Sequence, residues 1–151
     1  MQRRSMLERG AQVAAALAVA GLWPLPARAA WPQAAFDAKG VADAVKALGF
    51  AAPQESKDVS LTAPDIAENG AVVPMACACA LPGAKRIALL VEKNPNTLAA
   101  VFDLNDAIEP AFATRVKLAQ SSNVYAVALM SDGTALFAQK EVKVTLGGCG
   151  G

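Results

Sequence analysis

Residues 135–146, Ala135-Leu-Phe-Ala-Gln-Lys-Glu-Val-Lys-Val-Thr-Leu146, decide the predicted fold. In the second half of this stretch apolar and polar side chains alternate, with Glu141 and Lys143 on either side of Val142 and with Val144 following. Successive side chains of a β-strand point to opposite faces, so one face of this segment is apolar and the other is polar. The stretch therefore predicts a strand of an antiparallel sheet that lays one face on a core.

Further short apolar runs, each closed by turn residues, precede this strand. They cover residues 59–61, 71–80, 86–91, 97–104, 111–118 and 124–130. Several short strands at regular spacing without helices between them are typical of an immunoglobulin-like antiparallel β-sandwich. We therefore predict an all-β fold of this type. Pro74 lies inside one run, and proline donates no ladder hydrogen bond, so that segment is predicted to be an edge strand or to carry a bulge.

Two of the predicted strands, 87–91 and 124–130, are apolar on both faces. A lone sandwich buries only one face of each sheet. The second face must therefore be covered either by a helix of this chain or by another subunit.

One helix is predicted in the sandwich unit, from Phe36 to Leu48. Val41, Ala44 and Val45 form one apolar stripe with Leu48 at the spacing of a helix face. Such a stripe more often packs on its own domain than on a partner. Gly49 is well placed to end the helix in a left-handed conformation.

The chain divides into three predicted parts. Residues 1–29 have the charged start, short apolar run and small-residue cleavage pattern of an export signal, and the pair Arg3-Arg4 resembles a twin-arginine signal. An uncleaved membrane anchor is the alternative, although the run is shorter than the ~20 residues of a span. Residues 30–146 form the predicted sandwich with its helix, and residues 147–151 form a C-terminal arm. We expect the mature protein to begin near Ala30, to be periplasmic, and to have no membrane association after signal cleavage.

Composition excludes several classes of function. The chain has no histidine, which removes the usual general base and the commonest metal ligand. Its net charge of +1 gives no electrostatic footprint for nucleic acid. No phosphate loop, paired CxxC knuckle or catalytic triad is recognisable. We expect no cofactor, no metal and no catalytic residue.

The candidate functional residue is Cys149, in the terminal stretch Gly147-Gly148-Cys149-Gly150-Gly151. Glycine has no Cβ and opposes fixed local structure, so the four glycines predict a flexible arm that carries an accessible thiol. A frayed terminus with an incidental cysteine is the alternative.

The other two of the three cysteines, Cys77 and Cys79, form a C-x-C pair in a predicted strand. Their side chains should point to the same face, together with that of Met75. A redox pair or a Cu(I) site is one interpretation. Two small residues that fill a core are the favoured one.

The chain resembles the SoxY family, whose members are the sulfur-carrying subunit of the bacterial Sox thiosulfate-oxidation system. The resemblance is carried by residues 61–74 (LTAPDIAENGAVVP), 91–96 (VEKNPN), 114–117 (TRVK), 122–127 (SNVYAV) and the terminal GGCGG that follows KEVKVTL. It implies an immunoglobulin-like sandwich, a heterodimer with a SoxZ-like subunit, and covalent carriage of sulfur intermediates on Cys149. It also implies transient contacts with a thiosulfate-loading cytochrome, a sulfane dehydrogenase and a sulfate-releasing hydrolase. The C-x-C pair departs from the small polar residues that the family pattern leads us to expect there.

The sequence thus favours a periplasmic carrier that holds thiosulfate-derived intermediates and is not itself an enzyme. Two alternatives stay open. One is a secreted binding module whose tail cysteine forms an intermolecular disulfide. The other is a small copper-handling protein that uses Met75, Cys77 and Cys79.

Overall fold

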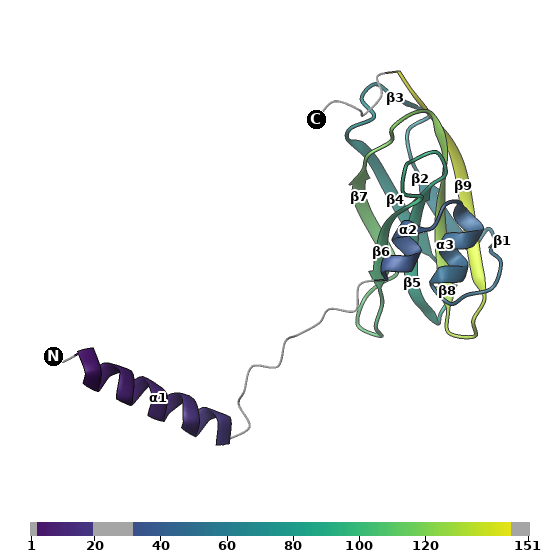
Figure 1. The fold of residues 1–151 in the computed structure, drawn as a ribbon. Helices are drawn as coiled ribbons and strands as arrows, with labels where there is room; N and C mark the ends of the chain where they lie inside the picture. The colour runs from purple at the N-terminus through teal and green to yellow at the C-terminus, as the bar shows by residue number, and fades with distance from the viewer. Residues whose placement is uncertain (1–2, 20–31, 146–151) are drawn as a thin grey trace. The chain divides into compact units, whose positions relative to one another are not determined.

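The computed structural model describes residues 3–19 and 32–145 and divides the chain into two units, residues 1–31 and 32–151 (Figure 1). The first unit contains the helix α1 (Arg3–Val19). Among the described residues, no helix is long and apolar enough to cross a membrane. The predicted arm, residues 147–151, lies outside the described residues.

The second unit contains two β-sheets. The larger sheet has the strand order β1-β9-β8-β5-β6, with β3 also pairing with β9, and the smaller sheet has the order β2-β4-β7. The strands of the larger sheet are β1 (Gln54–Glu55), β3 (Ile66–Ala67), β5 (Ala84–Val91), β6 (Leu98–Asp103), β8 (Ser122–Met130) and β9 (Ala135–Val144). Those of the smaller sheet are β2 (Val59–Thr62), β4 (Val73–Cys79) and β7 (Ala111–Val116). The predicted all-β sandwich is confirmed.

The long strands pair antiparallel, as expected. The short strands β1 and β3 differ, because both pair parallel with β9. Two-residue strands give too little alternation to be recognised in a sequence.

The main core lies between the two sheets. It receives Ile87, Leu89 and Val91 from β5 and Val73 and Met75 from β4. Ala88 and Leu90, which alternate with these residues along β5, point to the other side of the larger sheet. The two-faced apolar pattern of β5 and β8 therefore corresponds to two cores.

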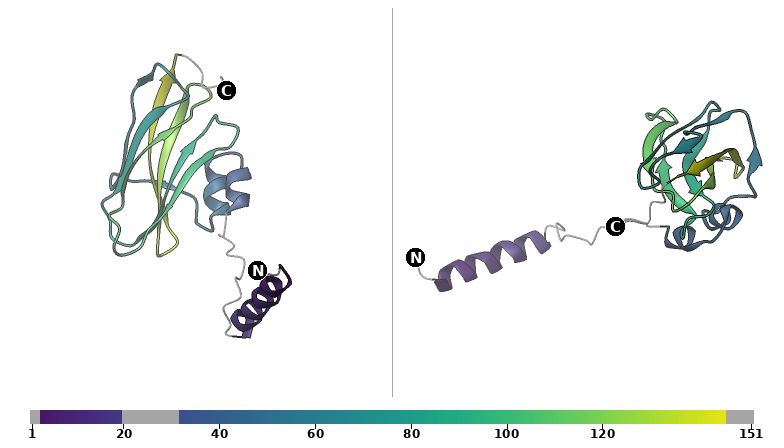
Figure 2. Two further views of the ribbon diagram at one scale, coloured as in Figure 1. Left: turned by 90° about the vertical axis from the view of Figure 1, so that its left-hand side faces the viewer. Right: turned by 90° about the horizontal axis from the view of Figure 1, so that it is seen from above.

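Two helices, α2 (Gln33–Asp37) and α3 (Val41–Ala47), cover that other side. Figure 2 shows them as a third layer on the outer side of the larger sheet. The buried helical residues Ala35, Ala44 and Val45 pack in one cluster with sheet residues such as Leu90 and Leu129. Of the two explanations for the two-faced strands, the helical cover is confirmed, and these strands give no argument for a second subunit.

The single helix predicted for residues 36–48 is divided into two short ones. The break lies at Ala38–Gly40, where Gly40 has φ 98° and ψ 152°. This is a region that is essentially restricted to glycine. The predicted termination at Gly49 is confirmed, since Gly49 has φ 89° and the N–H of Phe50 donates to the carbonyl of Val45 at 3.3 Å.

The prediction that β4 is an edge strand or carries a bulge is wrong. β4 lies in the middle of the smaller sheet, and neither of its ladders contains a register shift. Pro74 pairs with Arg115 on β7, whereas the ladder with β2 ends at the pair Thr62 and Ala76. The ladder with β2 therefore stops before it reaches the residue that has no N–H to donate.

Candidate functional site

The predicted functional thiol, Cys149, lies outside the described residues, and so do Gly147, Gly148, Gly150 and Gly151. The structure does describe the segment to which this stretch is attached. β9 pairs with β8 from Ala135 to Val142. The stretch 146–151 therefore continues directly from a strand of the larger sheet.

The end of β9 is held on both edges. On one edge, the N–H of Lys143 donates to the carbonyl of Asp65 at 2.9 Å, and the N–H of Thr145 donates to that of Ala67 at 3.1 Å. On the other edge, the N–H of Val144 donates to Oγ of Ser121 at 2.8 Å. The hydroxyl of Thr145 also donates to the carbonyl of Glu68 at 3.1 Å. Backbone and side-chain bonds thus hold the chain up to the last residue before Leu146.

Lys140 adds a cross-link to the same region. Its Nζ donates to the carbonyl of Ala63 at 2.6 Å and lies 3.0 Å from Oδ1 of Asp65. Both partners lie just before β3 in the sequence. Lys140 therefore links the segment that leads into β3 to strand β9. Sequence reasoning missed this role of Lys140, because its partners lie 75 and 77 positions away.

The two described cysteines lie in β4 with their side chains in the main core. Cys77 is 3% exposed and Cys79 is 5% exposed, and Met75 is buried on the same face. The predicted common orientation is therefore confirmed. Neither described cysteine forms a disulfide.

The surroundings of Cys77 and Cys79 oppose reaction. Burial raises the pKa of the Cys77 thiol from 9.0 to about 11, and a backbone hydrogen bond at Phe112 opposes this only in part. The thiolate is the nucleophile and the metal ligand. Sγ of Cys79 contacts the carbonyl of Leu81 at 3.8 Å. Among the described residues, no cluster of three or more cysteine or carboxylate side chains is arranged to hold a metal. The core-filling interpretation accounts for both residues.

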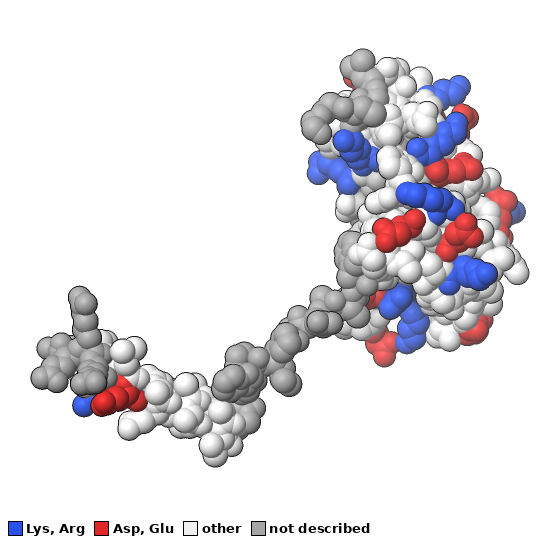
Figure 3. All heavy atoms as spheres, in the orientation of Figure 1, with Lys and Arg blue, Asp and Glu red and all other residues white. Residues whose placement is uncertain are grey.

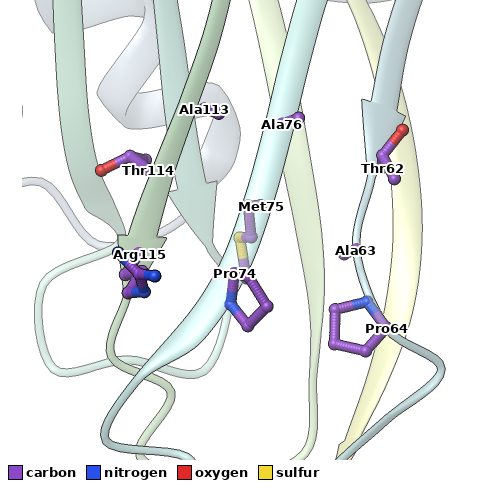
Figure 4. Close-up of a pocket in the computed structure, with 9 residues that line it drawn as sticks. All are labelled: Thr62, Ala63, Pro64, Pro74, Met75, Ala76, Ala113, Thr114 and Arg115. Carbon is purple, nitrogen blue, oxygen red and sulfur yellow. The ribbon is translucent and has the colours of Figure 1, made fainter.

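A groove lies on the outer side of the smaller sheet, near the ends of β2 and β7 (Figure 4). It has a volume of about 520 Å³. Figure 4 shows Pro64 and Pro74 beside each other in this groove, with Arg115 of β7 next to Pro74. Arg115 is the one charged residue among its lining residues. Sequence reasoning did not find this groove, because the residues that form it come from three strands.

The charges on the face shown in Figure 3 are mixed, with basic and acidic side chains interspersed over the sheets and helices. This agrees with the net charge of +1 for the whole chain. This view shows no large positively charged patch of the kind that binds nucleic acid.

These features define a class of protein: a two-sheet sandwich with a helical layer, whose two described cysteines are buried and whose third follows an anchored terminal strand. Within this class, the sequence model of "Sulfur oxidation protein SoxY" matches residues 44–149. The chain belongs to the SoxY family.

Solved structures agree with this assignment. The structure of the sulfur carrier protein SoxY from Chlorobium limicola f thiosulfatophilum is similar to this chain, with 36% identity and a TM-score of 0.60. The match covers 69% of this chain and 96% of that one. A comparison with curated protein sequences gives no match.

More distant structures share the fold alone. A superoxide reductase (neelaredoxin) from Ignicoccus hospitalis has 19% identity and a TM-score of 0.51, covering 57% of this chain and 79% of that one. A putative superoxide reductase from Thermotoga maritima has 13% identity and a TM-score of 0.53, covering 61% of this chain and 93% of that one.

Proposed function

We propose that this protein is a sulfur carrier that holds thiosulfate-derived intermediates covalently on Cys149 and presents them to the enzymes of a Sox system. Membership of the SoxY family and the likeness to a sulfur carrier from Chlorobium support the role in sulfur oxidation. We assign the carrier thiol to Cys149 because Cys77 and Cys79 are buried, and Cys149 is the third and last cysteine of the chain.

The position of Cys149 in the sequence suits this task. It stands four residues beyond Thr145, where the described bonds of β9 end. At ~3.3 to 3.6 Å per residue, an extended chain would carry the thiol roughly 13 Å from that anchor. We expect the flanking glycines to add little steric bulk around it, so that one thiol can enter several active sites.

The loading step is an oxidative coupling. A bond forms between Sγ of Cys149 and the outer sulfur of thiosulfate, the thiol gives up its proton, and two electrons leave the pair of sulfurs. A loading cytochrome accepts these electrons. The product is a thiosulfonate, Cys149–S–S–SO₃⁻, whose sulfur atoms a sulfane dehydrogenase and a sulfate-releasing hydrolase would then process. The carrier itself contributes the attachment point and no catalytic group.

Substitution of the cysteines tests this assignment. In a reconstituted thiosulfate-oxidising system, we expect Cys149→Ser to abolish loading, because a hydroxyl ionises far less readily than a thiol. The double variant Cys77→Ala/Cys79→Ala is the matched control and should load normally if it stays folded. Loss of loading in the double variant, together with normal loading of Cys149→Ser, would show that sulfur is attached at the C-x-C pair and not at Cys149.

We further propose that the protein is exported to the periplasm through its twin-arginine-type signal and associates there with a SoxZ-like subunit. A tagged chain should be recovered from the periplasmic fraction with its N-terminus near Ala30 and with the second subunit bound at equal amounts. Replacement of Arg3 and Arg4 by lysine should retain it in the cytoplasm. Periplasmic recovery that is unchanged by this replacement would exclude the twin-arginine route, and recovery without a second subunit would exclude the heterodimer.

A further inference from the structure

The loop between β7 and β8 is held by a side chain from another part of the chain. Nδ2 of Asn94 donates to the carbonyl of Lys117 at 2.6 Å, and Oδ1 of Asn94 accepts from the N–H of Ala119 at 2.9 Å. Between these two bonds, the N–H of Leu118 donates to the carbonyl of Gly70 at 2.7 Å. An amide side chain offers both donors and an acceptor, so it can replace a backbone neighbour in this way. The loop is therefore fixed on two sides although it belongs to no strand.

Ser121 ends this loop and lies beside the end of β9. Its Oγ accepts from the N–H of Val144 at 2.8 Å and lies 3.5 Å from the carbonyl oxygen of the same residue. Two residues of an antiparallel pair exchange bonds in the same way through their backbones. The backbone ladder between β8 and β9 ends at the pair Ser122 and Val142. The hydroxyl of Ser121 therefore continues this edge of β9 for two more residues.

Thr145 holds the opposite edge of β9. Its N–H donates to the carbonyl of Ala67, and its hydroxyl donates to the carbonyl of Glu68, both at 3.1 Å. Figure 1 shows β3, in which Ala67 lies, beside the end of β9. Thr145 is exposed and Ser121 is half-buried, so neither side chain fills the core. Their hydroxyls thus act on the end of β9 and not on the packing of the sandwich.

The four internal stretches that carry the resemblance to the SoxY family meet at this place. Residues 61–74 supply the carbonyl groups that β9 and the loop bind, and residues 91–96 supply the amide side chain that holds the loop. Residues 114–117 lead into the loop, and residues 122–127 follow it. Attachment of sulfur to Cys149 involves none of these stretches, whereas all four help to hold the end of β9.

We propose that Ser121 and Thr145 are positioning residues, which fix the point where the arm begins and thereby set the reach of Cys149. The inference rests on the proposed carrier function. From Thr145, an extended chain of four residues carries the thiol roughly 13 Å. With β9 released back to Val142, seven residues would carry it roughly 23 to 25 Å. The two hydroxyls therefore keep the thiol near the sandwich, which raises its local concentration at a docked active site about twofold relative to the released arm.

Amide hydrogen exchange measures the release of β9 directly. In Ser121→Ala/Thr145→Val, the N–H groups of Lys143 and Thr145, whose acceptors are backbone carbonyls, should exchange at least tenfold faster than in the parent chain. Amides in the middle of β8 should exchange at an unchanged rate, which shows that the sandwich stays folded. Unchanged exchange at Lys143 and at position 145 would show that the hydroxyls do not hold β9, and would overturn the proposal.

A shortened arm tests whether the reach matters for loading. Deletion of Gly147 shortens the arm by one residue, or ~3.5 Å, and should slow loading in the reconstituted system at least tenfold. Addition of Ser121→Ala/Thr145→Val to the deletion should raise the rate at least threefold, because the released end of β9 replaces the missing length. Ser131→Ala/Thr134→Val, in the turn between β8 and β9, is the matched control and should restore nothing.

A merely structural role of the two hydroxyls predicts a rate no higher than that of the deletion alone. That result, or a deletion variant that loads as fast as the parent chain, would overturn the proposal and leave Cys149 as the carrier thiol. Failure of the parent chain itself to load would refute the carrier function, and this inference with it.

Discussion

At the scale of the residue, the three cysteines occupy two different parts of the chain. Cys77 and Cys79 lie in the main core on one face of β4, whereas Cys149 follows a strand that ends at the edge of the domain. The alternation of β4 made the shared orientation of the C-x-C pair predictable. Their burial in a core was the favoured interpretation and is confirmed. The residues of the opposite sheet that cover them could not be named, because they are far away in the sequence.

The pKa of Cys77 predicts a dependence of stability on pH. Burial raises this pKa from 9.0 to about 11 in the folded protein. The unfolded chain therefore releases the thiol proton first. The contribution of Cys77 to the free energy of unfolding is fully present below pH 9 and should fall by on the order of 2 kcal/mol as the pH rises to about 11.

Urea denaturation of the parent and of Cys77→Ala between pH 8 and pH 11 measures this effect. The difference between the two free energies of unfolding should shrink as the pH rises. Burial and the nearby Glu92 also raise the pKa of Tyr125, but this tyrosine is common to both proteins and cancels. A difference that stays constant would show that the thiol is not desolvated.

At the scale of the element, the helical layer has the predicted apolar face but is divided into two helices. The apolar stripe of Ala44 and Val45 was recognised, and both residues are fully buried. The break before α3 was missed, because Gly40 was interpreted as part of one continuous helix. Tertiary bonds hold the break: Gly40 N–H donates to Oγ1 of Thr97 at 2.9 Å, and Nζ of Lys39 donates to the carbonyl of Pro95. Partners more than fifty residues away leave no local signal.

Gly40→Ala should destabilise the sandwich unit. A Cβ at this position would meet nothing closer than Oδ2 of Asp43 at 4.0 Å, so the cost comes from the backbone conformation. We expect a loss of roughly 1 to 3 kcal/mol in the free energy of unfolding, measured by urea denaturation. Ala42→Ser, on the exposed side of α3, should change it by less than about 0.5 kcal/mol. An equal effect of the two substitutions would refute the strain at Gly40.

The strands of the sandwich were predictable because each long strand has a periodic pattern and a turn at its end. The neighbours of β9 were not, since β1 and β3 are only two residues long. The bonds of β3 to Lys143 and Thr145 are nevertheless part of what fixes the end of β9. The bonds that hold the chain up to Thr145 were therefore found only in the structure.

At the scale of the whole molecule, two short helices cover the outer face of the larger sheet. Strands β5 and β8 are apolar on both faces because α2 and α3 occupy the second face. Their hydrophobicity thus requires no other subunit. Among the described residues, no helix covers the outer face of the smaller sheet, and no single strand made that face recognisable in the sequence.

Cys149 is the proposed carrier thiol. The most direct test is mass spectrometry of the unreduced protein from cells oxidising thiosulfate, with the C-terminal peptide separated from the peptide that holds Cys77 and Cys79. We expect added sulfur or sulfonate on the C-terminal peptide, removable by reductant, and an unmodified C-x-C peptide. An unmodified C-terminal peptide, with sulfur, copper or a disulfide on the C-x-C peptide instead, would contradict this assignment.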